Sequence, residues 1–334
     1  MRVAVLSPVA WRTPPRHYGP WEQIASNIAE GLIKLGVDVT LFATGYSITA
    51  GKLDAICAQG YEEDRCQDAK VLECLHISNL MEKAGNFDII HNNFDFLPLT
   101  YSALIKTPML TTIHGFSSPR IIPVYKKYNE TNHYVSISNA DRNHELSYLA
   151  TVYNGLDTTN FKFSHTPEDY LLYFGRIHPD KGTAEAIAIA KKSKRKLLIA
   201  GIVQDETYFK EKIEPELNDD IKFLGSAGPE KRSELLGMVA ALLHPINFNE
   251  PFGLSVAEAM LCGTPVIAFN RGSMPELIKH QETGFLVSSV DEAVEAVNNL
   301  PLINRQYCCD WATSKFSVDK MAGDYLELYK RILG

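Results

Sequence analysis

The chain has 334 residues, of which 45% are hydrophobic, and a formal net charge of −7 from 33 Lys+Arg against 40 Asp+Glu. This length predicts two domains of ordinary size, and the acidic balance argues against nucleic acid as a general partner. The sequence has neither a signal-peptide pattern nor an apolar run of about 18 residues, and its six cysteines lack metal-ligand spacing. We therefore expect a cytoplasmic protein with reduced thiols and without stable insertion in a membrane.

Strand and helix patterns alternate through the first half of the chain. A short apolar strand at 3–6 precedes a helix that begins at Gly19-Pro20, where proline fits the first turn, and a second strand follows at 37–42. Residues 44–64 are polar and predict the start of a helix followed by a loop. The other expected elements are helices at 68–83, at 96–105 and from Ala140, with Ser138-Asn139 as its cap, and strands at 87–91, 109–113, 134–137 and 150–153.

The same alternation restarts after a turn-rich stretch at 155–168, which predicts an interdomain linker. Two rounds of alternation predict an α/β fold of two doubly wound Rossmann-like domains, residues 1–160 and 161–316, that face each other across a cleft. Ligands of such domains bind in the loops that follow the strands. The expected strands lie at 170–174, 196–200, 221–224, 240–244 and 266–269, and the expected helices at 183–192, 206–217, 230–237, 254–261, 290–299, 303–314 and 317–333.

The stretch 249–265 carries two carboxylates eight positions apart, Glu250 and Glu258, with a turn that ends in Gly253 between them. The helix that begins after Gly253 offers unpaired N–H groups and the positive end of its dipole, which suit a phosphate. Because Gly253 lacks a Cβ, an anion can approach the backbone closely there. Carboxylates accept hydrogen bonds from sugar hydroxyls, so the pattern predicts a site for a nucleotide sugar.

Together with other motifs, this stretch resembles the retaining glycosyltransferases of family 4, which have the GT-B fold. The resemblance covers nearly the whole chain, and its opening is most similar to the group that includes the avilamycin-pathway glycosyltransferase. One departure is Pro20, which offers no N–H where the family commonly has a second glycine. The motifs that carry the resemblance are Glu250-x7-Glu258, Gly175-Arg176, Lys181-Gly182, the stretches 263–267, 284–287 and 112–115, and Gly19 with Glu22.

The resemblance implies catalytic roles for His114, Arg176, Lys181 and Glu250. Arg176 and Lys181 would bind the donor diphosphate and stabilise it as the leaving group. Glu250 would hold hydroxyls of the transferred sugar, Glu258 those of the ribose, and His114 would lie near the donor sugar. The residues implied in donor binding are Gly19, Gly175, Arg176, Lys181, Gly201, Leu224, Phe252, Gly253, Leu254 and Glu258.

Loops of the first domain are expected to bind the acceptor, because aromatic and amide side chains suit ring stacking and hydroxyl recognition. His91 also ends a strand, and a packing role fits it as well as a role in the site. By the resemblance, the final helix, 317–334, would pack back on the first domain. The residues expected at the acceptor are Trp11, Arg16, Tyr18, Asn92, Asn93, Asp95 and Phe116.

The leading hypothesis is a retaining glycosyltransferase that moves a hexose from a nucleotide-diphosphate sugar, UDP-glucose first, to a hydroxyl of a small or saccharide acceptor. A GDP-mannose-dependent mannosyltransferase is the alternative within this class. A nucleotide-sugar 2-epimerase and a non-catalytic nucleotide-sugar binder are alternatives of other classes. Because the chain has no Asp-x-Asp motif and offers Arg176 and Lys181 as cations, we expect neither a metal nor another cofactor.

Overall fold

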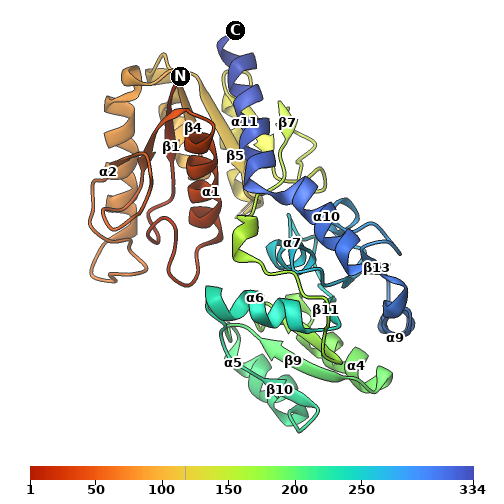
Figure 1. Ribbon diagram of the computed structural model, residues 1–334. Coiled ribbons are helices and arrows are strands. Elements are labelled where there is room, and N and C mark those ends of the chain that lie inside the picture. Colours follow the sequence, from red (N-terminus) through yellow and green to blue (C-terminus); the bar gives the residue numbers. More distant parts are fainter. Residues whose placement is uncertain (117) are drawn as a thin grey trace. The chain divides into compact units, whose positions relative to one another are not determined.

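The computed structural model describes residues 1–116 and 118–334, the side chains of residues 229 and 230 excepted. The chain divides into two compact units, Met1–Leu156 with Val318–Gly334 and Asp157–Ser317. Each unit is a twisted β-sheet with helices packed against it (Figure 1). No helix of the described residues has the length and apolar character needed to cross a membrane.

The first unit is built on a seven-stranded sheet in the order β3-β2-β1-β4-β5-β6-β7. All neighbouring strands run parallel, so every strand ends at the same edge. Strands β4 and β5 are buried along their whole length, including the polar residues His91, Asn92, Thr111 and Thr112. The bounds are β1 Arg2–Leu6, β2 Asp38–Phe42, β3 Lys52–Asp54, β4 Ile89–Asn92, β5 Met109–Ile113, β6 His133–Ser136 and β7 Ala150–Thr151.

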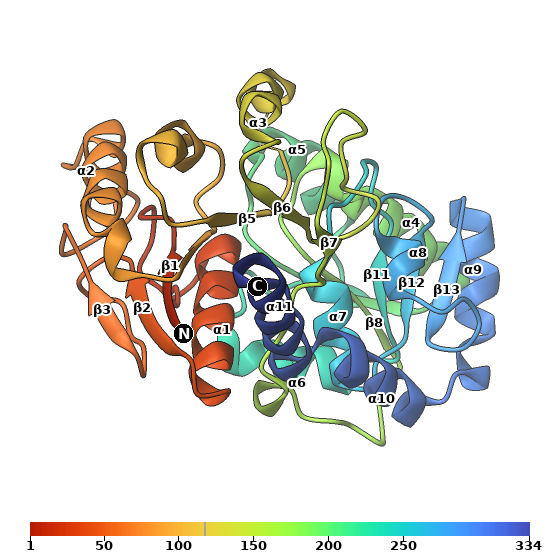
Figure 2. The same cartoon turned by 90° about the horizontal axis from the view of Figure 1, so that it is seen from above.

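The last helix of the chain completes the first unit by packing beside the first helix, as both views show (Figures 1 and 2). Gly31 of α1 makes this approach possible, because a Cβ there would lie 2.7 Å from both Ala322 and Val318. The helices of this unit are α1 Pro20–Lys34, α2 Ala69–Glu82, α3 Ile122–Tyr128 and α11 Val318–Leu333, with short 3₁₀ segments at Ala84–Asn86, Leu97–Leu104 and Pro119–Ile121.

His91 ties the sheet to α11 and is a packing residue. Its Nδ1 lies 2.6 Å from the hydroxyl of Tyr329, and its Nε2 lies 2.7 Å from the hydroxyl of Thr112. The hydroxyl of Tyr325 lies 2.8 Å from the same Thr112 oxygen. Burial lowers the pKa of His91 to about 3, so the ring is neutral within this network. Of the two roles that its sequence position allowed, the structure supports packing.

The second unit is built on a six-stranded parallel sheet in the order β10-β9-β8-β11-β12-β13. Its strands are β8 Tyr170–Phe174, β9 Lys196–Ala200, β10 Ile221–Phe223, β11 Ala241–His244, β12 Val266–Phe269 and β13 Gly284–Val287. Its helices are α4 Thr183–Ser193, α5 Glu206–Tyr208, α6 Pro229–Met238, α7 Leu254–Leu261, α8 Met274–Leu277, α9 Val290–Asn298 and α10 Arg305–Phe316. Shorter helical turns lie at Thr158–Asn160, Pro179–Lys181, Phe209–Ile213, Glu214–Glu216 and Leu300–Leu302.

Several predicted elements differ in the structure. The helix expected from Ala140 is wrong, because residues 137–149 form turns in which Ser138 and Asn143 each accept a nearby backbone N–H. The segment 96–105 forms a 3₁₀ helix, and the expected helix 206–217 breaks into α, π and 3₁₀ turns before and around Pro215. The polar stretch 44–64 contains the edge strand β3, whose polarity hid it.

The order of strands reverses once in each sheet, between β1 and β4 and between β8 and β11. Loops that leave two such neighbouring strands in opposite directions form a crevice at the carboxyl edge of the sheet. In the first unit these loops begin after Leu6 and Asn92, and in the second after Phe174 and His244. Residues expected from the sequence to bind ligands lie in or beside these loops.

Candidate functional site

Two loops meet closely at the carboxyl edge of the second sheet. The loop after β8 ends in Gly182, whose φ of +75° and position against Pro245 require glycine, because a Cβ would lie 1.9 Å from the Pro245 carbonyl oxygen. The N–H of Asn247 donates to the carbonyl of Asp180 at 2.7 Å. These contacts join the loop that carries Lys181 to the loop that carries Glu250.

Lys181 and Glu250 form a partly buried ion pair at this junction. The Lys181 Nζ donates to Glu250 Oε2 at 2.7 Å, and the two side chains are 15% and 14% exposed. The ammonium group also lies 4.4 Å from the centre of the Phe248 ring, within range of a cation–π contact. The two residues predicted to bind phosphate and sugar are therefore already in contact with each other.

His244 lies beneath this pair and was missed by sequence reasoning. It is the last residue of β11, is buried, and its Nε2 lies 3.8 Å from Glu250 Oε2. Burial lowers the pKa of His244 to about 4, an effect that Lys181 adds to and Glu250 opposes, so the ring is neutral. Its place at the end of a buried strand, beside the reversal of strand order, is the signal that could have identified it.

The turn before α7 brings backbone to the site and keeps its side chains elsewhere. Gly253 has a φ of +90°, and a Cβ there would lie 2.7 Å from the Met274 Cε. The Phe252 ring is buried and packs edge-on against Phe316 at 5.7 Å. Ser273 holds the turn from the other side, since its hydroxyl donates to the Phe252 carbonyl at 2.7 Å. Gly253 precedes α7 and Leu254 begins it, so their backbone lies at the helix N-terminus where the sequence predicts a phosphate.

Glu258 is held by a cation that the sequence did not single out. Its side chain is buried on α7, and the Nη1 of Arg232 on α6 donates to its Oε1 at 2.9 Å. The Arg232 guanidinium lies 5.6 Å from the centre of the Phe174 ring. One carboxylate oxygen is thus fixed by arginine, which orients the group for hydrogen bonds from hydroxyls.

The other predicted donor residues of this unit lie along the same edge. A Cβ on Gly201 would lie 1.7 Å from the Gly175 carbonyl oxygen, so the loops after β8 and β9 touch through their backbones. Arg176 donates from Nη1 to the side-chain carbonyl of Gln204 in the loop after β9. Leu224, directly after β10, is 45% exposed.

In the first unit the structure brings His114 and Asn93 together. His114 follows β5, is 9% exposed, and its Nε2 lies 3.0 Å from the Asn93 side-chain oxygen. The Trp21 ring stacks on the imidazole, with ring centres 5.9 Å apart. Burial lowers the pKa of His114 to about 3, so the ring is neutral and can both donate and accept a hydrogen bond.

Glu22 organises the corner where the loop after β1 enters α1. The carboxyl group is buried and accepts the Trp11 N–H at 3.3 Å. Burial raises the pKa of Glu22 to about 7. Gly19 precedes it with a φ of +149°, and a Cβ there would lie 2.9 Å from Glu22 Oε2. Gly19 therefore serves the packing of this corner, and its predicted approach to a phosphate stays a prediction.

The remaining residues expected at the acceptor divide into exposed and internal groups. Arg16 and Tyr18 are exposed, whereas Phe116 packs edge-on against Tyr125 at 5.6 Å. The same Tyr125 donates its hydroxyl to Asp95. Asn92 is fully buried and bonds to the backbone of Asp95 and of Phe94. We correct its assignment, because these bonds use its amide to shape the loop and do not leave it facing an acceptor.

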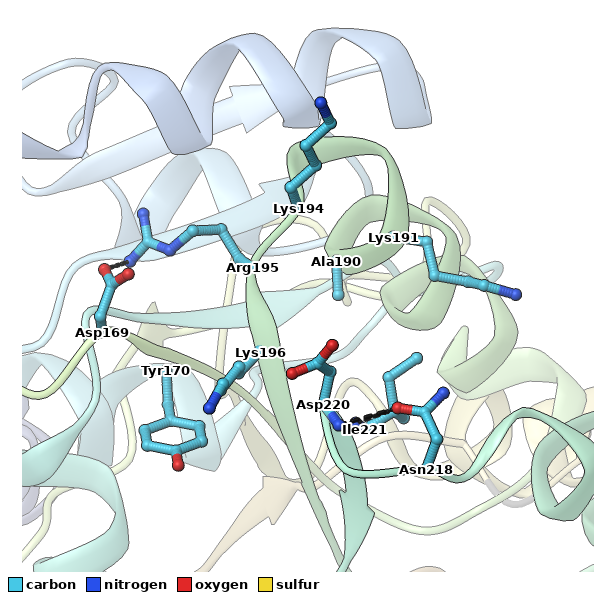
Figure 3. A pocket seen from close by; sticks show the side chains of 10 residues that line it. All are labelled: Asp169, Tyr170, Ala190, Lys191, Lys194, Arg195, Lys196, Asn218, Asp220 and Ile221. Carbon is cyan, nitrogen blue, oxygen red and sulfur yellow. Dashed lines mark hydrogen bonds and ion pairs between the residues drawn. The ribbon is translucent and has the colours of Figure 1, made fainter.

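A hollow of about 610 Å³ lies at the opposite, amino edge of the second sheet (Figure 3). Its charges are largely satisfied within the protein, since Arg195 pairs with Asp169, and Lys191 with Glu216. Figure 3 shows the amines of Lys191 and Lys194 pointing outwards. Residues 1–116 and 118–334 contain no group of three or more His, Cys, Asp or Glu side chains placed to hold a metal ion.

The family model of the glycosyl transferases group 1 matches residues 157–307, which is most of the second unit. An uncharacterized glycosyltransferase of Methanocaldococcus jannaschii is 22% identical over 98% of this chain and 94% of its own length. The D-inositol 3-phosphate glycosyltransferase of Mycolicibacterium smegmatis is 30% identical over 48% of this chain and 40% of its own.

Solved structures extend the likeness to both units. AviGT4, a glycosyltransferase involved in avilamycin A biosynthesis, has a TM-score of 0.75 at 23% identity, over 100% of this chain and 98% of its own. HepE of Anabaena, in its complex with UDP-glucose, has a TM-score of 0.71 at 18% identity, over 99% of this chain and 100% of its own. The chain has the GT-B fold.

Proposed function

We propose that this GT-B protein is a retaining glycosyltransferase that moves a hexose from a nucleotide-diphosphate sugar to an acceptor hydroxyl. The observation that carries the proposal is the cluster at the carboxyl edge of the second sheet, where Lys181, Glu250 and the turn at Gly253 meet. This cluster lies within the segment that matches the group 1 glycosyl transferases. A lysine, a helix N-terminus and two oriented carboxylates together fit a diphosphate flanked by two sugars.

In this proposal Lys181 and Arg176 neutralise the diphosphate, while Glu258 accepts hydrogen bonds from the ribose and Glu250 from the transferred hexose. The bond between the sugar C1 and the phosphate oxygen breaks, and a bond from C1 to the acceptor oxygen forms on the same face. The acceptor hydroxyl proton passes to the departing phosphate oxygen. The cations stabilise the charge that develops on the leaving diphosphate, which is the step that most needs help without a metal.

The first unit supplies His114, Asn93 and the loop at Trp11 for the sugar and the acceptor. A neutral imidazole suits this role. Its Nε2–H donates to the Asn93 oxygen, so Nδ1 is left to accept a hydrogen bond from a hydroxyl, and the ring does not repel the positive charge that develops at C1. We expect a saccharide or small-molecule acceptor and a cytoplasmic location.

UDP-glucose is the first expected donor, since the HepE structure that shares the fold holds it. A GDP-mannose donor is the second candidate, because a GDP-mannose-dependent mannosyltransferase of Dictyostelium discoideum is 26% identical over 41% of this chain. The proposed role of Glu258 at the ribose hydroxyls does not select the base.

A thermal-shift panel tests the donor first, with UDP, GDP, ADP, dTDP and their common sugars, each with and without EDTA. A ligand that binds only the folded protein raises its melting temperature once the concentration exceeds Kd. We expect one diphosphate to act, equally with and without EDTA. Loss of the shift in EDTA would contradict metal independence, and no shift for any nucleotide would overturn the proposal.

Incubation with the selected nucleotide sugar then separates the reaction classes. Proton NMR of the glycoside product should show the anomeric configuration of the donor, and the glycoside is the product to read because a free sugar mutarotates. An inverted product would contradict retention. A product epimerised at C2 would support an epimerase, and binding without turnover over days would support a non-catalytic binder.

A further inference from the structure

His244 carries a buried donor that the structure leaves unused. Its Nε2 is inaccessible to solvent and has no hydrogen-bond partner among the residues described. A buried polar atom without a partner is costly and uncommon in folded proteins, so this one calls for an explanation. Glu250 Oε2 lies 3.8 Å from this nitrogen, which is too far for a hydrogen bond.

The atom that His244 could bond is occupied by Lys181. Glu250 Oε2 accepts the Lys181 ammonium at 2.7 Å, on a side chain only 14% exposed. In the proposed function the same ammonium binds the donor diphosphate. A phosphate that draws Lys181 away would leave Glu250 without its cation in a largely buried place, which opposes phosphate binding.

We propose that His244 is a positioning residue that takes over Glu250 when Lys181 turns to the donor diphosphate. The inference rests on the proposed function. Closing the 3.8 Å separation to a hydrogen bond of about 2.9 Å needs only a small rotation of the Glu250 side chain. The Nε2–H then donates to Oε2, and the other carboxylate oxygen stays directed at the sugar hydroxyls. Glu250 thus has two alternative partners, Lys181 in the empty protein and His244 when the diphosphate is bound.

This arrangement makes a specific distinction between two ligands. A nucleoside diphosphate draws Lys181 away and brings no hydroxyl to Glu250, so its binding depends most on His244. A nucleotide sugar supplies hydroxyls that also donate to Glu250 and so needs His244 less for binding. A histidine that only fills space would affect both ligands alike and would affect the stability of the empty protein.

The matched variants are His244→Gln, whose amide can place a donor near the Nε2 position, and His244→Met, which fills similar volume without one. Calorimetry measures the Kd of UDP and UDP-glucose if the wild type binds UDP, or of GDP and GDP-mannose if it binds GDP. We expect His244→Met to raise the Kd of the diphosphate roughly tenfold or more and that of the nucleotide sugar less. His244→Gln should stay within about threefold of wild type, and the melting temperature of the empty Met variant should not fall.

If both variants bind the diphosphate as wild type does, or if both lose affinity to the same extent, the inference is overturned and the proposed function still stands. No nucleotide binding by the wild type would overturn both, because nothing would then draw Lys181 away. A second measurement decides the question if the Met variant does not fold. In wild type labelled with ¹⁵N-histidine, addition of the diphosphate should shift the His244 Nε2–H signal towards that of a charge-assisted hydrogen bond, and an unmoved signal would overturn the inference.

Discussion

The carboxyl edges of the two sheets carry opposite chemistry on the same scaffold. At the second sheet acidic and basic side chains form ion pairs, Lys181 with Glu250 and Arg232 with Glu258. At the first sheet burial favours the neutral form of the titratable groups, because it lowers the pKa of His114 to about 3 and raises that of Glu22 to about 7. Both edges lie where the strand order reverses.

The difference teaches that the fold fixes where a ligand binds and the edge residues fix its chemistry. Cations that are already oriented can bind a diphosphate with little rearrangement, provided that the carboxylate they leave finds another donor. Neutral donors and acceptors suit an uncharged sugar or acceptor hydroxyl. The predictions below would break this contrast or make it sharper.

Lys181→Ala should have the largest effect. Removing the cation from the leaving-group site should lower kcat/KM by roughly 10²-fold or more, the scale of one lost contact to transition-state charge. Steady-state kinetics at varied donor concentration measures it. Lys191→Ala, at the amino edge of the same sheet, is the matched control and should keep its activity. Near-normal activity of Lys181→Ala would remove this lysine from the site.

Glu258→Ala should mainly weaken donor binding. The carboxylate is expected to hold ribose hydroxyls, and hydrogen bonds to a charged group contribute about 1.5–3 kcal/mol. Donor KM and diphosphate Kd should rise roughly 10- to 100-fold, with a smaller change in kcat. Calorimetry with the diphosphate alone isolates the effect from the sugar, and an unchanged Kd would contradict the assignment of Glu258 to the ribose.

His114→Ala tests the carboxyl edge of the first sheet, where the expected effect is on kcat and not on diphosphate binding. Under the proposed function, loss of His114 should lower kcat roughly 10- to 100-fold and leave the diphosphate Kd within about twofold, because the proposal assigns phosphate binding to Arg176, Lys181 and the turn at Gly253. The exposed His144→Ala provides the control. A large loss of diphosphate affinity in His114→Ala would break the proposed division between the edges.

Glu22→Gln should change stability with pH. The folded pKa of about 7 lies above the ordinary value of 4.5, so the contribution of Glu22 to wild-type stability declines as pH rises from about 4.5 to about 7 and is level above that range. The amide does not ionise, so the variant should match wild type near pH 4.5 and exceed it by about 1–3 kcal/mol at pH 8. Denaturant midpoints at both pH values measure this, with the exposed Glu211→Gln as control. A variant less stable at pH 8 would show that the carboxylate form is needed.

Much of the fold could be predicted from the sequence, because buried parallel strands such as β12 are short apolar runs between turn residues. Prediction failed where the pattern was weak or local bonds competed. The edge strand β3 has only three residues and carries one apolar side chain, and the turns after Ser138 replace a helix with side-chain-to-backbone bonds.

The candidate site divides in the same way. Glu250, Glu258 and the turn at Gly253 lie within ten positions of each other, so the sequence singles them out together. Arg232 and His244 reach these carboxylates from α6 and β11, and only the place of His244 at the end of a buried strand hints at such a contact. Asn92 shows the opposite case: a polar residue at the end of a strand was assigned to the acceptor, whereas its amide bonds to the backbone of the loop that follows.

The central claim is that the charged edge of the second sheet binds the diphosphate. Hydrogen–deuterium exchange with and without saturating UDP, or GDP if that is the diphosphate that binds, tests it most directly. The account predicts the strongest protection in residues 175–182 and 249–258, because amides there would contact or border the phosphates. Protection confined to the loops after β1 and β5, with 175–182 and 249–258 unchanged, would contradict it.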